Sequence, residues 1–203
     1  MGAAEPHVRW AARRSNRLDL FEYVAIAFSL IFSFAVLRLV GGISYALEPG
    51  RMYWVHAAHV GFQLLGNAIS FWVMWSFREV EWTLPRFLLI LAGPTLYYFN
   101  ASVLIPEAPA SVESWRAHYF SVRRRYWGAI CLWSLVALTN ASVLLGLPLL
   151  DSMRTPPIVL FLLGIAGIAS ASPRLHAVLA IILTCVAPLS ALILLSLPGE
   201  LAP

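Results

Sequence analysis

Six apolar stretches dominate this chain, and each is about long enough to cross a lipid bilayer. A membrane-spanning helix needs about 20 mainly apolar residues, and the stretches lie at about 21–40, 52–77, 84–105, 126–147, 156–170 and 175–197. Inside a bilayer every backbone N–H and C=O group needs a partner within the protein, so apolar stretches of this length fold as helices. The sequence therefore predicts an all-α fold, a polytopic membrane bundle of about six transmembrane helices.

The composition predicts a single domain. The chain is 60% hydrophobic and 12% charged, whereas soluble domains carry about 25% charged residues. The longest stretches outside the expected helices are a basic arm at 1–20 and a segment at 106–125. Both are too short to bury a core of their own, so we predict one transmembrane domain over 21–203.

All fourteen basic residues are arginines, and the sequence contains no lysine. Lysine forms the Schiff bases of retinal and pyridoxal proteins and grips phosphate in the Walker A loop. These chemistries are therefore excluded. Cys131 and Cys185 lie within apolar stretches, where thiols usually pack as small hydrophobic groups.

The second stretch contains a polar stripe. Its polar residues recur at steps of three and four, which places them on one face of a helix. Polar groups are costly at membrane depth, so this face must contact protein or water. The stripe consists of His56, His59, Gln63, Asn67 and Ser70.

The first, third and fourth stretches each carry a sparser polar face. Together with the stripe, these faces predict a polar seam among the first four helices. Pro94 is expected to bend the third helix. The candidate path residues are Glu22, Ser29, Ser33, His56, His59, Gln63, Asn67, Asn100 and Asn140.

This seam has two interpretations. It is either a path or pocket for an ion, a proton or a small polar solute, or a set of interhelical hydrogen bonds worth about 0.6 kcal/mol each. Glu22, His56 and His59 are its titratable members. The spacing of the two histidines allows two metal ligands from one helix, but a third ligand is not evident. We therefore expect no metal, no cofactor and no catalytic group.

Residues 111–125 predict an interfacial amphipathic helix that runs into the fourth stretch. Val112, Trp115, Tyr119, Val122 and Tyr126 fall on one helical face. Aromatic rings and arginines of this kind anchor a helix to headgroups and lipid phosphates. The alternative is a docking surface for an anionic lipid or a partner protein. The contact residues would be Arg116, Arg123, Arg124 and Arg125.

Small residues and arginines predict the packing and the orientation of the bundle. Gly164, Ala166 and Gly167 let a neighbouring backbone approach closely, and we expect that neighbour to be the sixth helix. The first helix usually dominates orientation. Four arginines precede it and one follows it in the next loop, which predicts a cytoplasmic N-terminus.

Three short segments carry a resemblance to a known group of proteins. They are Phe21-Glu22-Tyr23, Glu81-Trp82-Thr83, and Arg116-Ala117-His118-Tyr119-Phe120 with the arginines that follow. Over about 21–127 the chain resembles a group of bacterial polytopic inner-membrane proteins of uncharacterised function. The resemblance implies a bacterial inner membrane and no particular activity.

These observations favour a small channel or transporter-like protein, or the membrane subunit of one. The alternative is a non-catalytic scaffold or accessory subunit that binds a partner or an anionic lipid, and a membrane-embedded enzyme is third. The expected partners are membrane lipids and either a second copy of the chain or another membrane protein. No nucleic-acid partner is expected.

Overall fold

The computed structural model describes residues 6–186 and residue 188. Within this part of the chain the regular structure is helical throughout, as the sequence predicts. Three short 3₁₀ helices, η1 (Met74–Phe77), η2 (Pro109–Ser111) and η3 (Ser152–Arg154), lie in the connections. The longer elements are α1 (Pro6–Ala46), α2 (Trp54–Val73), α3 (Leu84–Leu104), α4 (Trp115–Val143), α5 (Thr155–Ala169), α6 (Pro173–Ile181) and a π-helical turn, η4 (Ile182–Val186).

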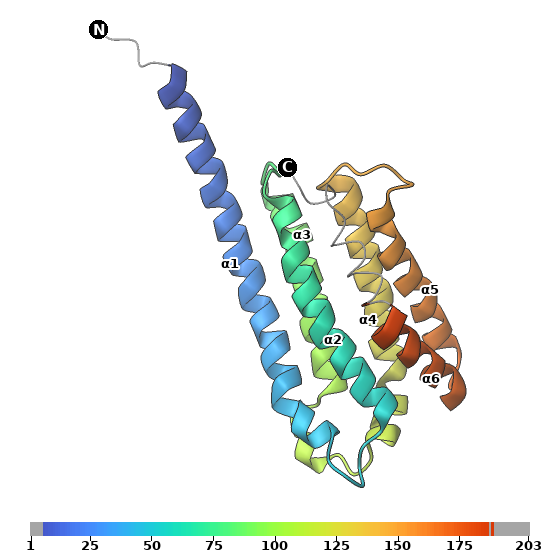
Figure 1. The fold of residues 1–203 in the computed structure, drawn as a ribbon. Coiled ribbons are helices and arrows are strands. Elements are labelled where there is room, and N and C mark those ends of the chain that lie inside the picture. Colours follow the sequence, from blue (N-terminus) through green and yellow to red (C-terminus); the bar gives the residue numbers. More distant parts are fainter. Residues whose placement is uncertain (1–5, 187, 189–203) are drawn as a thin grey trace.

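Successive helices run in opposite directions and form two layers (Figure 1). Helices α1, α3, α4 and α5 pack in a row, in that order. Helix α2 packs against α1 and α3, and also contacts α6 and η4. The N-terminal part of α1 extends past the other helices.

Four helical segments in the described part of the chain are long and apolar enough to cross a membrane, and they belong to the four helices of the row. They are Leu20–Ala46, Leu84–Ser111, Trp115–Val143 and Ser152–Ala169. Helix α2 is not among them, because its polar stripe lowers its mean hydropathy. Helix α6 with its π-helical turn forms a shorter apolar helix, Pro173–Cys185. The expected continuation of this helix to 197 lies outside the described residues.

Local sequence signals explain several helix ends. Helices α3, α5 and α6 carry proline in the first turn, where its missing N–H costs nothing. The Ser114 side chain accepts a hydrogen bond from the Ala117 amide and caps α4. Gly146 turns the chain after α4 with a φ of 63°, which favours glycine.

Helices α1 and α4 begin earlier than the sequence predicts. The expected basic arm continues into α1 from Pro6 onward, and the expected interfacial helix is the first part of the continuous helix α4. The aromatic face of this segment is buried inside the bundle, with Trp115 and Tyr119 each at 0% exposure. The Trp115 indole donates to the Tyr45 carbonyl at 2.7 Å, so this face serves interhelical packing.

Helix α5 packs mainly on α4, whereas the small-residue pattern predicts α6 as its neighbour. Gly164 faces Cys131, and Gly167 faces the indole ring of Trp127. The small residues therefore bring two backbones together as expected. The partner differs because a small-residue stripe specifies close approach but not which helix approaches.

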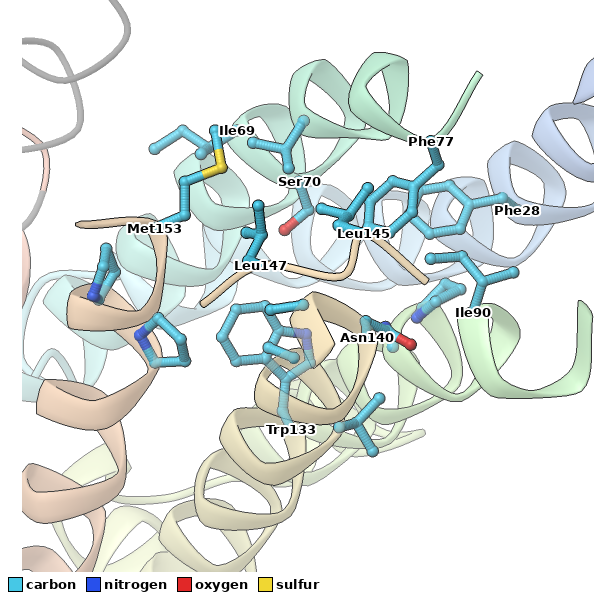
Figure 2. Close-up of a pocket in the computed structure, with 18 of the residues that line it drawn as sticks. Phe28, Ile69, Ser70, Phe77, Ile90, Trp133, Asn140, Leu145, Leu147 and Met153 are labelled. Atoms are coloured by element: carbon cyan, nitrogen blue, oxygen red, sulfur yellow. The ribbon is translucent and has the colours of Figure 1, made fainter. Parts of the chain in front are cut away.

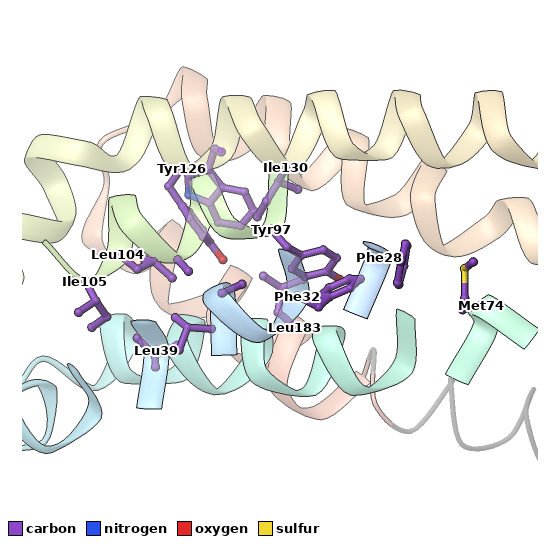
Figure 3. Close-up of a cluster of buried hydrophobic side chains, with 14 of the residues drawn as sticks. Phe28, Phe32, Leu39, Met74, Tyr97, Leu104, Ile105, Tyr126, Ile130 and Leu183 are labelled. Atoms are coloured by element: carbon purple, nitrogen blue, oxygen red, sulfur yellow. The ribbon is translucent and has the colours of Figure 1, made fainter. Parts of the chain in front are cut away.

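Aromatic side chains fill the core between α1, α3 and α4 (Figure 3). The rings of Phe28 and Phe32 lie 4.6 Å apart, and the rings of Phe32 and Tyr97 lie 5.1 Å apart. Tyr97 also packs edge-on against Trp133 at 5.5 Å. Such aromatic contacts contribute about 0.5–1.5 kcal/mol each beyond the area they bury.

The α4–α5 contact provides a stability test. A Cβ at Gly167 would overlap the buried Trp127 ring, so we expect Gly167→Ala to lower the free energy of unfolding by about 1–3 kcal/mol. Gly61 is exposed on α2, and a Cβ added there meets only open space, so Gly61→Ala should leave stability unchanged or raise it slightly. Denaturant unfolding in detergent measures both, and equal stabilities would contradict the close contact.

Candidate functional site

Two histidines and two tyrosines from three helices meet near the end of the bundle where α4 and α6 begin. His59 comes from α2, Tyr119 and Tyr126 from α4, and His176 from α6, and all four have 0% exposure. The Tyr119 hydroxyl oxygen lies 3.0 Å from His59 Nε2 and 2.8 Å from His176 Nδ1. The Tyr126 hydroxyl oxygen lies 3.2 Å from His59 Nδ1. We call these four residues the histidine–tyrosine cluster.

The Ser170 carbonyl oxygen, which His176 contacts, determines which atom donates in each hydrogen bond of the cluster. His176 Nε2 lies 2.9 Å from the Ser170 carbonyl oxygen, which can only accept, so in a neutral ring Nε2 carries the proton and Nδ1 accepts. Tyr119 therefore donates to His176. The Tyr119 oxygen in turn accepts from His59 Nε2, which leaves His59 Nδ1 to accept from Tyr126. Every donor in the cluster points toward Ser170.

Trp127 supports this arrangement from α4. Its indole N–H donates to the Tyr119 oxygen at 3.2 Å, and its ring packs edge-on against His59 with centroids 5.2 Å apart. The His59 ring also stacks on Tyr119 at 5.2 Å. The cluster is therefore held by ring packing as well as by hydrogen bonds.

A small cavity lies next to the cluster in the interior of the bundle. The Gln63 side chain lies beside Tyr126, and Gln63, Tyr97 and Asn100 line a cavity of about 10 Å³. Gln63 Oε1 and Asn100 Oδ1 are buried and have no hydrogen-bond partner. A cavity of this size is close to the minimum for one water molecule, which needs two or more polar partners.

A hydrogen bond connects the wall of the small cavity to the wall of a larger one. Ser70 donates to the Tyr97 hydroxyl at 3.2 Å, and Ser70 and Asn140 line a cavity of about 240 Å³. Trp133 lines both cavities. The larger cavity also contacts the connection after α4, at the opposite end of the bundle from Ser170. Polar groups thus extend from Ser170 to the wall of the large cavity.

His56 lies outside this line, although the sequence places it on the same stripe as His59. Its Nε2 lies 3.0 Å from the Leu104 carbonyl oxygen, its ring stacks on Trp115 at 4.6 Å, and its Nδ1 has no partner. His118 Nε2 lies 3.2 Å from the same carbonyl. Both histidines bind the end of α3, which is a structural contact.

The remaining predicted path residues divide into two groups. Glu22 and Ser33 are exposed on α1, and the Ser29 and Ser33 hydroxyls donate to carbonyls of their own helix at 2.5 and 2.8 Å. Helix α1 therefore adds none of these three to the line. Asn67 is buried beside Gln63 and donates to its carbonyl at 3.0 Å. Asn140 is buried in the wall of the large cavity.

The predicted arginine surface is partly exposed. Arg116, Arg124 and Arg125 are exposed on α4, whereas Arg123 is half-buried and donates to the Phe120 carbonyl at 3.2 Å. Tyr53, just before α2, packs its ring 6.0 Å from that of Tyr119. Burial raises the pKa of Tyr53 above its ordinary value of 10, and the charge of Arg116 opposes this rise. Tyr53 is therefore neutral at physiological pH.

Within the described residues, no group of three or more His, Cys, Asp or Glu side chains lies close enough to share a metal ion. His59 and His176 also use both ring nitrogens in hydrogen bonds to tyrosines and a carbonyl. The cluster can accept and donate protons, because each imidazole ring accepts at one nitrogen and donates at the other.

Sequence reasoning missed three of the four cluster residues as members of the site. His176 lies alone in its apolar stretch, and the pattern around Tyr119 and Tyr126 predicts a headgroup-facing surface. Their spacing of seven residues does place both tyrosines on one face of α4. The signal for a common face was present, but the sequence did not indicate that this face meets α2 and α6.

No protein-family model, curated protein or solved structure matches this chain. The class that the fold defines is an all-helical protein with four helices long and apolar enough to cross a membrane, among the described residues. Any function must therefore be argued from the site itself.

Proposed function

We propose that this chain is a small transporter-like membrane protein that passes protons along the line of polar groups between α2, α3, α4 and α6. The observation that carries the proposal is the histidine–tyrosine cluster, in which Tyr126 donates to His59, and His59, Tyr119 and His176 each both accept and donate a hydrogen bond. Among side chains, histidine is the usual proton shuttle near neutral pH.

The proton balance of one transfer follows from the hydrogen-bond direction. A proton that reaches the Tyr126 oxygen releases the Tyr126 proton to His59 Nδ1, and His59 Nε2 passes its own proton to Tyr119. Tyr119 gives its proton to His176 Nδ1, and His176 Nε2 releases its proton to solvent water at the Ser170 end. Each group ends neutral, with the hydrogen bonds among the four side chains reversed and the bond from His176 Nε2 to the Ser170 carbonyl lost, because that carbonyl can only accept. The reversed bonds must turn back before the next transfer, so we expect slow flux.

Gln63 is suited to act as a gate in this line. It lines the small cavity beside Tyr126, whose oxygen is the atom at which a proton would enter, and a carboxamide does not exchange protons as readily as water. When Gln63 turns away, a water from the small cavity can take its place. The polar line is then continuous from the small cavity to Ser170.

The free-energy cost of burying the two histidines of the cluster supports a functional interpretation. Ionisable groups at membrane depth are expensive and usually mark ion or proton pathways. Interhelical adhesion alone is achieved by serine and asparagine at about 0.6 kcal/mol per hydrogen bond. Adhesion between helices does not require two buried histidines that share one tyrosine hydroxyl.

Proton flux into vesicles tests the proposal. Purified protein is reconstituted with a pH-sensitive dye inside, and a potassium diffusion potential drives proton entry. We expect Tyr119→Phe to lower the flux at least about tenfold, because it removes the hydroxyl that joins His59 to His176. Gln63→Ala should raise the flux, because it removes the gate.

The matched control is Tyr98→Phe, which removes the same atom from an exposed tyrosine of α3. This variant should conduct like the unchanged protein. Gel filtration and thermal unfolding identify any variant that has lost its fold. The proposal is wrong if the unchanged protein conducts no faster than empty vesicles, or if folded Tyr119→Phe protein conducts equally well.

A second candidate function is contact with anionic lipid or a partner through α4. It is favoured by the exposure of Arg116, Arg124 and Arg125 near one end of the bundle, where each arginine contributes about 1 kcal/mol to binding an anionic surface. Replacing all three by Gln should remove co-purifying anionic lipid, as measured by mass spectrometry. Arg174→Gln, a single change at the start of α6, should retain most of it. Equal lipid content in both variants would argue against this function.

We propose a bacterial inner membrane as the location, with the N-terminus in the cytoplasm. The support is the resemblance over about 21–127 and the four arginines that precede the apolar part of α1. A protease added to the outside of spheroplasts should then leave an N-terminal tag intact. Removal of the tag in intact spheroplasts would reverse the orientation.

A further inference from the structure

The large cavity is a second feature with the character of a binding site (Figure 2). Its volume is about 240 Å³, and five helices together with the connection after α4 contribute to its wall. Phe28, Phe77 and Trp133 supply aromatic surface, and Ile90 supplies aliphatic surface. Ligand pockets combine mostly apolar walls with a few placed polar groups.

The polar atoms of the wall define what the cavity can bind. No Asp, Glu, Lys, Arg or His lines it among the described residues, and its polar side chains are Ser70, Asn140, Ser152 and the Trp133 indole. Asn140 is 8% exposed, and its Oδ1 is buried without a hydrogen-bond partner. An unpaired buried acceptor requires a donor from whatever occupies the cavity.

Pro94 interrupts the backbone hydrogen bonding of α3 beside the cavity. Pro94, in the interior of α3, has no N–H to give to the Ile90 carbonyl four residues earlier. Both residues line the cavity. The wall therefore offers one unpaired acceptor, Asn140 Oδ1, beside hydroxyl and indole groups and no charge, which favours a neutral molecule with a hydrogen-bond donor over an anion or a cation.

We propose that this cavity binds a neutral, mainly apolar molecule with one hydroxyl group, such as a long-chain or isoprenoid alcohol. The apolar part contacts Phe28, Phe77 and Trp133, and the hydroxyl donates to Asn140 Oδ1. This site goes beyond proton passage, because it requires neither His59 nor Tyr119.

Photolabelling in lipid nanodiscs tests the site with a defined probe. The probe is hexadecan-1-ol with a diazirine in its chain, and the labelled residues are mapped by mass spectrometry. We expect labels on cavity residues such as Met153. Unlabelled hexadecan-1-ol should compete about tenfold better than its methyl ether, because the ether cannot donate to Asn140 Oδ1.

Two variants separate specific binding from general partition into lipid. Gly93 lines the cavity, and the nearest atom to an added Cβ is Trp133 Nε1 at 4.0 Å, so Gly93→Leu should fill the cavity and abolish its label. Gly61→Leu, at an exposed glycine of α2, should leave the label unchanged. Asn140→Leu should remove the preference for the alcohol over the ether, whereas Ser142→Leu, at an exposed position two residues later, should retain it.

The outcomes distinguish this proposal from proton passage. A label confined to lipid-facing residues, or alcohol and ether competing equally against the unchanged protein, would overturn the site. Labelling of the cavity by the probe together with a failed flux assay would support the site and reject proton passage. If Gly93→Leu proves unfolded, the comparison of Asn140→Leu with Ser142→Leu still decides the question.

Discussion

Side chains that bind backbone carbonyls at helix ends hold this bundle together. The last carbonyls of a helix lack partners within the helix, and a membrane interior supplies no water to satisfy them. Arg38 donates to the Ile105 carbonyl at the end of α3 at 2.9 Å, and Arg154 donates in the same way to the Pro148 carbonyl, in the connection between α4 and α5, at 2.8 Å. Arg154 is itself 6% exposed, so its charge is used for structure. The arginines of this chain therefore serve as long donors between segments as well as surface charges.

The same requirement fixes the candidate site. His176 caps the end of α5 through Ser170, and this contact assigns its tautomer. The tautomer then determines which way Tyr119 and His59 point their protons. His56 satisfies the end of α3 in the same manner and is thereby removed from the line. One physical need, the pairing of terminal carbonyls, thus separates a structural histidine from a member of the cluster.

The spacing of residues in the sequence predicts which side chains share one face of a helix. The structure shows which other helix each face contacts. The stripe on α2 is predicted to contact protein or water, and in the structure it faces protein, with His59, Gln63 and Asn67 at 0%, 2% and 3% exposure. The buried face of α4 and the partner of α5 were not predicted, because an amphipathic pattern does not state whether its apolar side meets lipid or protein. Spacing alone groups Glu22 with the stripe, and it lies exposed on α1. Tertiary contacts between residues as distant as Tyr119 and His176 leave no trace in a single sequence.

The pair Ser70 and Tyr97 joins the polar line to the large cavity at one hydrogen bond. Ser70 lines the large cavity and donates to Tyr97, which lines the small cavity beside Gln63. Neither hydroxyl has its direction fixed by a backbone carbonyl within this pair, unlike His176. A hydroxyl that donates to Asn140 Oδ1 in the large cavity still has lone pairs that accept from Ser70, and such a bond would release Tyr97 to turn. Occupancy of the large cavity would then determine the orientation of the Tyr97 hydroxyl, while Ser170 determines the orientation of His176.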